Sequence, residues 1–179
     1  MEDFKKRDNY DAPTLYLKDS NNDQLFCYLE QILKIDGNDY GLLTPVDTPV
    51  FLFKINNNDE FEHIERIEKD DLILKTADAV LQEHDLTLLR SSILLTVSGD
   101  LEEPNIDDIE ESNNIHDEDE NYQELINFYV NNQEYALAIP LDPFFLYGKI
   151  SNDGALYIEE DELDKLLPIF ESELEKIYS

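Results

Sequence analysis

The sequence contains few of the residue types that build common catalytic and metal sites. Of its 179 residues, one is cysteine, five are glycine and three are histidine. The single cysteine, Cys27, excludes a disulfide framework and a cysteine-based metal site, and it fits a reducing compartment. With so few glycines, and no Walker pattern, the chain is poorly equipped to cradle a phosphate.

Long apolar segments are also missing. No run approaches the roughly 20 apolar residues that a membrane helix needs. The first seven residues, Met1–Arg7, have no apolar segment behind them, so we expect neither membrane insertion nor a secretory signal. We therefore expect a cytoplasmic protein, or a protein of the plastid stroma if it is organellar.

Positive charge is the scarcest property. Lys and Arg number 13 against 43 Asp and Glu, for a formal net charge of −30, and residues 91–148 contain no Lys or Arg at all. Such a surface repels nucleic-acid phosphates and anionic lipid. It attracts basic protein surfaces instead, although acidity that only maintains solubility explains the same charge.

What the chain does have is enough apolar material for a core. Hydrophobic residues make up 41% of it, with nine Phe and ten Tyr, which argues against global disorder despite the charge. The first 13 residues are polar and predict a flexible N-terminus.

From residue 14 the pattern is that of strands separated by turns. Short apolar runs alternate with clusters of Asp, Asn and Gly, and Asp36-Gly37 is the strongest hairpin signal. The predicted strands of this antiparallel meander are 14–17, 25–35, 40–44, 50–55 and 60–64.

Two helices and two further strand regions follow. Asp70 and Asp71 lie where an N-cap and a first-turn acid belong, before a helix that ends near Glu83 with Leu72, Ile73, Thr76, Val80 and Leu81 on one face. Residues 86–97 predict one long strand. A second meander is expected over 125–158, and a C-terminal helix from about Asp161, kinked or restarted at Pro168.

One motif occurs twice. Tyr40–Asp47 is matched 95 positions later by Tyr135–Asp142, and both copies continue into an apolar stretch that ends in Lys-Ile. Self-similarity of this kind indicates how a chain is built. Asp47 and Asp142 follow a proline in a bend, where aspartate most often fixes a turn by accepting backbone N–H groups.

The predicted fold is therefore α+β, with two related antiparallel β-meander units, the second flanked by helices. We expect a small antiparallel β domain over 14–65 and an α+β domain over 66–179. Residues 100–121 contain eleven acids and no base, and they predict a disordered acidic loop.

The acidic segment and the second copy of the motif supply the candidate partner-binding residues. They are Glu102, Glu103, Asp107, Asp108, Asp117, Glu118, Asp119, Glu120, Tyr135 and Asp142. For Tyr135, packing at the edge of a core is the simpler interpretation, and for the acidic run it is a solvated loop.

No catalytic residue, cofactor or metal ligand is predicted. Asp117, Asp119 and Asn121 match the start of a calcium loop, but Tyr122 stands where glycine is required and Phe128 where a bidentate Glu belongs. The three histidines share no ligand spacing. An enzyme is disfavoured, and only a site assembled in three dimensions, with perturbed carboxylate pKa values, would restore that possibility.

Two segments resemble a known family. They are Thr76–Leu88 leading into Leu94–Asp100, and Glu134–Pro143 followed by the helix over Leu163–Phe170. Together they resemble domain of unknown function thirty-seven twenty-seven, an uncharacterised family of cyanobacteria and plastids. Residues 14–65 are similar to the acidic β-rich unit, domain of unknown function twelve ninety-two, that often precedes it.

The resemblance implies no catalytic residues, and it implies a role in building or regulating photosynthetic machinery. With the charge, it predicts a non-catalytic binding or assembly factor that holds a basic surface of a partner protein. The alternative is a mimic of nucleic acid that presents carboxylates to a DNA- or RNA-binding protein.

Overall fold

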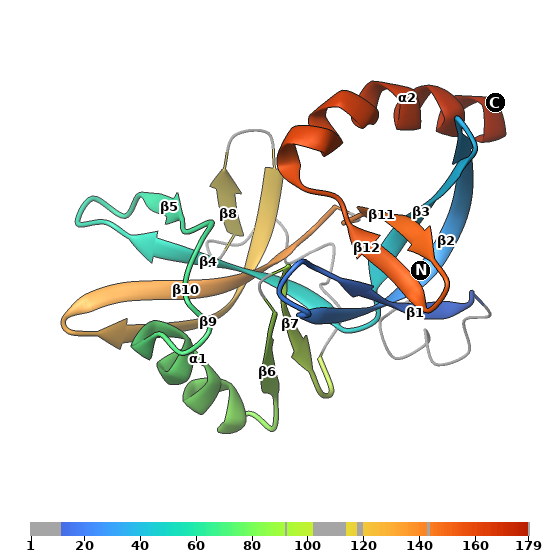
Figure 1. Ribbon diagram of the computed structural model, residues 1–179. Coiled ribbons are helices and arrows are strands. Elements are labelled where there is room, and N and C mark those ends of the chain that lie inside the picture. The colour runs from blue at the N-terminus through green and yellow to red at the C-terminus, as the bar shows by residue number, and fades with distance from the viewer. Residues whose placement is uncertain (1–11, 92, 102–113, 118–119, 143, 179) are drawn as a thin grey trace. The chain divides into compact units, whose positions relative to one another are not determined.

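The computed structural model describes residues 12–91, 93–101, 114–117, 120–142 and 144–178. These residues are mostly β-strand with two helices (Figure 1), which agrees with the predicted α+β class. In chain order the elements are β1 (Thr14–Lys18), β2 (Gln24–Ile35), β3 (Asn38–Pro45), β4 (Thr48–Ile55), β5 (Phe61–His63), α1 (Leu72–Gln82), β6 (Thr87–Arg90), β7 (Leu95–Ser98), β8 (Asn114–Asp117), β9 (Glu120–Val130), β10 (Gln133–Pro140), β11 (Leu146–Ser151), β12 (Gly154–Tyr157) and α2 (Glu160–Tyr178).

The chain divides into two compact units. Unit 1 contains Asp47–Phe144, and unit 2 contains Asp11–Val46 together with Phe145–Ser179. Unit 2 is therefore built from two segments that are distant in the sequence, and over the described residues the chain passes from one unit to the other after Val46 and before Phe145.

Unit 2 is a closed barrel in which the strands follow the order β1-β12-β11-β3-β2. Its only parallel pairing among the described strands is β1 with β12, which closes the barrel. The interior contains Leu17, Cys27, Leu43 and Ala155, all fully or almost fully buried. Alternation along each strand sends these side chains inward.

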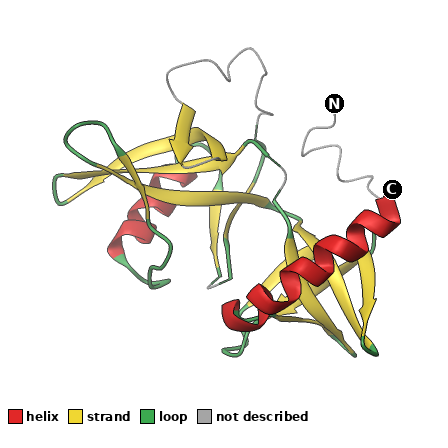
Figure 2. Ribbon diagram, turned by 90° about the horizontal axis from the view of Figure 1, so that it is seen from above, coloured by secondary structure: helices red, strands yellow, loops and turns green. Residues whose placement is uncertain are grey.

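Helix α2 covers one outer side of this barrel, as Figure 2 shows. Its apolar stripe is centred on fully buried Phe170, whose ring stacks on Tyr147 at a centroid distance of 4.6 Å and also contacts Tyr40. Glu159 accepts the first helical hydrogen bond, from Leu163 N–H. Pro168 lies inside one continuous helix and does not begin a second one.

Unit 1 is a seven-stranded sheet in the order β6-β7-β4-β10-β9-β8, with β5 also paired to β4. Helix α1 and strands β6 and β7 enclose one core on one face of β4, β10 and β9. The other face has a second, aromatic core that includes Phe53 and Tyr122. In this half of the chain Asp71 is the N-cap of α1, where its carboxylate accepts from Ile73 N–H at 2.8 Å.

The predicted boundary at residue 65 lies inside unit 1, so the domains are not divided as the sequence indicated. The two related segments are not separate units either. The segment Tyr40–Ile55 contributes β3 to unit 2 and β4 to unit 1, while Tyr135–Ile150 contributes β10 to unit 1 and β11 to unit 2. Long-range pairing of β3 with β11 and of β4 with β10 causes this exchange.

Three local expectations also need correction. Residues 86–97 form a hairpin of β6 and β7 and not one strand, since Ser91 turns the chain by accepting from Ile93 N–H. Residues 114–117 and 120–121 of the expected acidic loop are in strands, and 102–113 and 118–119 lie outside the described residues. Leu72 is exposed, and Leu74 and Ala77 are buried in its place on α1.

Candidate interaction surface

The face of unit 1 that carries the aromatic core is arranged in rows across the sheet. Residues directly opposite one another on paired strands share a face. One row contains Asn127, Ala136, Phe53 and His63, from β9, β10, β4 and β5 in turn. The aromatic rings of Phe53 and His63 are in contact at 5.3 Å between centroids, so this row changes from polar on β9 to aromatic on β4 and β5.

The neighbouring rows bring two carboxylates to the same face. Glu134 on β10 is opposite Ile55 of the aromatic core on one side and opposite Tyr129 on the other. Glu124 on β9 is opposite Ala138, another residue of that core. We refer to Glu124, Asn127, Tyr129 and Glu134 as the β9–β10 acidic patch.

A β-bulge sets the composition of this patch. The register of β9 against β10 shifts so that Ile126 is opposite Leu137 and Glu124 is opposite Ala138, with Leu125 as the extra residue. An extra residue reverses the alternation of the strand beyond it. As a result Leu125 and Ile126 both pack in the α1 core, and Glu124 lies on the same face as Asn127.

The two carboxylates of the patch share one amide. Asn127 Nδ2 donates to Glu134 Oε2 at 2.5 Å, and Asn127 also hydrogen-bonds Glu124. The pKa of Glu124 is raised, chiefly because partial burial disfavours its charged form and also because Glu134 repels it; the Asn127 hydrogen bond opposes this rise. Within the described part of the chain, neither carboxylate forms an ion pair.

The β2–β3 hairpin of unit 2 shows that this polarity is not needed for the fold. Its ladder has the same register as β9–β10 with every residue number lower by 95, for example Leu33 opposite Tyr40 and Phe128 opposite Tyr135. The positions that correspond to Glu124 and Asn127 are Leu29 and Ile32. A hairpin of the same geometry thus carries apolar residues where the patch carries a carboxylate and an amide.

Such a patch suits a cationic group. Ionised carboxylates only accept hydrogen bonds, and two of them near one another attract a guanidinium or ammonium group. Tyr129 is 63% exposed and offers an aromatic face, on which a cation is also stabilised. The arrangement therefore combines hydrogen-bond acceptors with an aromatic ring, and both can contact a bound cation.

The predicted partner-binding residues are only partly described. Six of them, Glu102, Glu103, Asp107, Asp108, Glu118 and Asp119, lie outside the described residues. Asp117 and Glu120 are opposite each other on β8 and β9. Tyr135 is half-buried beside Phe128, on the face that packs under α1.

Asp142 is exposed in the bend after β10. Its counterpart Asp47 is partly buried, and this burial raises the pKa of its carboxyl group. The structure therefore does not bring Tyr135 and Asp142 together with the carboxylates of the patch.

Sequence reasoning missed the patch itself. Glu124, Asn127 and Glu134 are separated by a hairpin turn and by the bulge at Leu125, so no regular spacing relates them. The available signal was the run without Lys or Arg, which contains all three residues.

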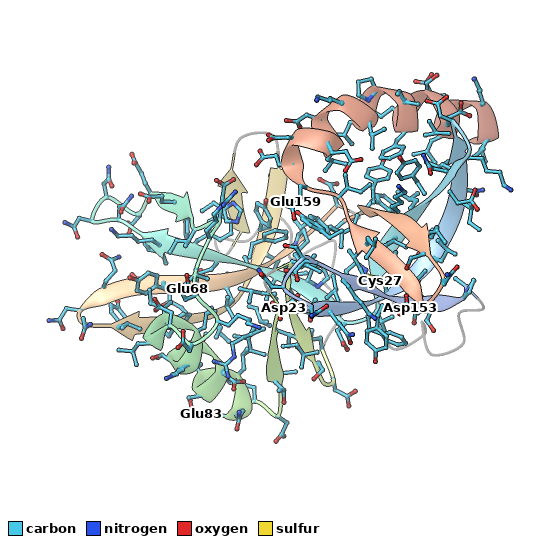
Figure 3. The ribbon with its side chains drawn as sticks, viewed as in Figure 1. Asp23, Cys27, Glu68, Glu83, Asp153 and Glu159 are labelled. Atoms are coloured by element: carbon cyan, nitrogen blue, oxygen red, sulfur yellow. The ribbon has the colours of Figure 1, made fainter. Side chains whose placement is uncertain are left out.

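Other reactive groups belong to the core or the surface. Cys27, labelled in Figure 3, is buried inside the barrel of unit 2, and desolvation raises the pKa of its thiol to about 12. Asp153, also labelled, forms an ion pair with Lys18 at 3.4 Å, and this charge lowers its pKa. Among the described residues no group of three potential ligands could hold a metal ion, and none of the described helices has the length and apolarity to cross a membrane.

The fold and the patch define a strongly acidic, mostly β protein with an accessible acceptor surface. Comparison with family models then identifies its relatives: the model described as a protein of unknown function (DUF3727) matches residues 85–176, slightly more than half of the chain. The chain belongs to this family. Comparisons with curated proteins and with solved structures give no match.

Proposed function

We propose that the protein is a non-catalytic, acidic binding or assembly factor that engages a basic surface of a partner protein. The observation that carries this proposal is the β9–β10 acidic patch, where two carboxylates share the Asn127 amide and have no cation of their own within the described residues. A partner's Arg or Lys supplies the missing charge.

The energetics favour such a partner. Glu124 is held in a partly buried place where its charged form is disfavoured and where Glu134 repels it. A bound cation relieves both effects, and hydrogen bonds to charged groups contribute about 1.5–3 kcal/mol each. Tyr129 adds a contact of about 0.5–1 kcal/mol with a cation over its ring.

Long-range attraction supports the same partner chemistry. A net charge of −30 attracts a basic protein before contact and raises the association rate, more strongly at low ionic strength. The proposal places the protein in the cytoplasm or the plastid stroma of an oxygenic phototroph. Biogenesis or regulation of the photosynthetic machinery is the process in which we place the partner, because of the family resemblance described above.

The test is affinity purification from the native cell at low and at high salt. We expect basic proteins to be recovered at low salt and lost at high salt. The double variant Glu124→Gln/Glu134→Gln should reduce recovery at least tenfold, since it removes two charge-assisted contacts. The matched control is Glu60→Gln/Glu62→Gln, which removes the same charge from exposed positions of the same unit. Equal losses in both variants would refute a role for the patch, and recovery unchanged by salt would refute the proposal.

A second candidate is a mimic of nucleic acid that occupies a DNA- or RNA-binding protein. The observation in its favour is the stretch of 58 residues, 91–148, with 14 acids and no Lys or Arg. Competition between this protein and duplex DNA for the recovered partner distinguishes the two candidates. Displacement of DNA favours the mimic, whereas simultaneous binding favours the assembly factor.

A further inference from the structure

The ladders that join the two related segments match residue for residue. In unit 2, Leu43 on β3 is opposite Leu146 on β11. In unit 1, Ala138 on β10 is opposite Phe51 on β4. The two pairs are related by the 95-residue offset of the repeat: position 43 corresponds to 138, and position 146 corresponds to 51. In the same way, the pair Gly41–Gly148 corresponds to the pair Ala136–Phe53.

Irregular features obey the same shift. The bulge on β2 leaves out Glu30, and the bulge on β9 leaves out Leu125, 95 residues later. The two-residue turns Asp36-Gly37 and Asn131-Asn132 are also 95 apart, and all four residues have positive φ, as the tight turn of a hairpin requires. Bulges and turn conformations are specific features, so their coincidence is not a consequence of strand periodicity alone.

The correspondence extends to the ends of both segments. β5 pairs with β4 as β12 pairs with β11, and β1 pairs with β2 as β8 pairs with β9. Helix α1 follows β5, and helix α2 follows β12. Each helix covers the hairpin that the other segment contributes to the same unit. α1 packs over β9 in unit 1, and α2 packs over β2 and β3 in unit 2.

We infer that residues 14–82 and 114–178 are two copies of one five-strand, one-helix module, and that each copy is the other's binding partner through exchanged strands. Each unit takes three strands from one copy and two strands with the following helix from the other. Exchange of identical elements is a common route to dimers, and here both partners are in one chain.

The interior of unit 2 shows why the exchange is selective. A Cβ atom added to Gly148 would lie 2.8 Å from Leu17 Cδ1 and 3.0 Å from Ala155 Cβ, and one added to Gly41 would lie 2.8 Å from Leu29 Cδ1. Large side chains therefore crowd both glycines: Leu17 on β1 lies against Gly148 on β11, and Leu29 on β2 lies against Gly41 on β3. Around Gly148, the second copy contributes the small residues Gly148 and Ala155, and the first copy contributes the larger Leu17 and Leu43.

In unit 1 the first copy contributes β4 and β5, the strands equivalent to β11 and β12, and it is now these strands that carry the large residues. The position that corresponds to Gly148 is Phe53, which is fully buried, and β10 faces it with Ala136 and Ala138. Phe61 stands where unit 2 has Ala155 and contacts Phe53 edge-on, at 6.4 Å between centroids. At these positions the small residues, Ala136 and Ala138, are from the second copy, and the large ones, Phe53 and Phe61, are from the first.

Pairing of either copy with itself would break this match. The first copy alone would place Phe53 in the space where unit 2 has no room for a methyl group, and overpacking is destabilising. The second copy alone would place Gly148 opposite Ala136 and leave a cavity, which is also destabilising. The complementary sizes therefore select cross-copy pairing over self-pairing.

The test is to cut the full chain between the copies. A protease recognition sequence is inserted after Asn105, and a tag is placed on the N-terminal fragment. After cleavage in native buffer, affinity purification through the tag should recover both fragments in equal amounts. The two fragments should then elute together in size-exclusion chromatography. If the copies were independent domains, the fragments would separate while each kept its strand signal in circular dichroism, and this result would overturn the inference.

Selectivity is tested by separating the fragments in denaturant and refolding them. Native mass spectrometry of the mixture should give the one-to-one complex of different fragments in at least tenfold excess over pairs of identical fragments. Equal abundance of the three species would contradict the size argument. Gly148→Ala should lower the denaturant concentration at which the cut fragments separate, and Lys149→Ala, at the exposed next position, should not.

Discussion

At the scale of single residues, the same position in the two units can be compared within one molecule. Glu124 and Leu29 occupy corresponding places in the β9–β10 and β2–β3 ladders. Leucine there serves packing, whereas glutamate is partly desolvated and repelled by Glu134. We infer that Glu124 costs stability in the free protein and is retained for binding, since sites that bind are often less stable than the fold allows.

Glu124→Gln should therefore stabilise unit 1 at neutral pH, by about 0.5 kcal/mol or more. A carboxyl group whose folded pKa is raised favours the folded state most when it is protonated. The contribution of the Glu124 carboxyl group to folding stability is therefore fully present below the pKa of an unfolded Glu, near 4.3. It is lost as the pH rises through the pKa of Glu124 in the folded protein. Urea unfolding at pH 7 and at pH 4 measures the difference between variant and parent.

The advantage of Glu124→Gln should be smaller at pH 4, because the parent carboxyl is then largely protonated. A variant that is less stable than the parent at pH 7 would show that the carboxylate is a structural group. Glu62→Gln, at an exposed position of β5 in the same unit, is the control for removal of one charge.

At the scale of elements, local rules account for where strands and helices begin and end. Asp36-Gly37 predicts the β2–β3 turn, and Asp70-Asp71 predicts the start of α1; the structure has both, although the N-cap is Asp71 and the first turn of α1 contains no acid. The β6–β7 hairpin was missed, because the polar turn at Ser91 interrupts a run that reads as one apolar strand. The buried face of α1 was misjudged at Leu72, since helical spacing alone does not say which of two adjacent apolar stripes meets the sheet.

Element docking gives a second prediction, for α2. Phe170 is fully buried and contacts Tyr40 and Tyr147, so Phe170→Ala should destabilise unit 2 by about 3–5 kcal/mol. Ile169→Ala, at the 40% exposed neighbouring position, should change stability by less than about 1 kcal/mol. Amide hydrogen exchange along α2 and β2 measures both. Comparable effects of the two substitutions would mean that the helix does not depend on this anchor.

At the scale of the whole molecule, charge and connectivity dominate. The formal charge of −30 makes carboxylates repel one another throughout the folded chain, and self-repulsion destabilises compact states. Connectivity acts differently: because both units contain strands from both copies, damage to one copy affects the two units together.

Added salt should therefore stabilise the protein. Raising NaCl from 10 to about 150 mM shortens the screening length from about 30 to about 8 Å, and we expect the urea midpoint of unfolding to rise. Choline chloride at equal ionic strength is the control, since screening by ionic strength does not depend on which cation is present. A midpoint that falls or stays constant would indicate that the acids are distributed so as to avoid mutual repulsion.

The sequence by itself determined the α+β class, most strand and turn positions, the start of α1 to within a residue and the acidic character. These depend on local periodicity, turn chemistry and composition, which a single chain displays directly. Only the tertiary structure decided which strands pair. Leu43 of β3 pairs with Leu146 of β11, and Phe51 of β4 pairs with Ala138 of β10, far apart in the sequence. The choice of these partners depends on matched sizes inside each unit, such as Gly148 beside Leu17 and Phe53 beside Ala136. Periodicity does not encode such a match, so the exchange and the β9–β10 acidic patch could be found only in three dimensions.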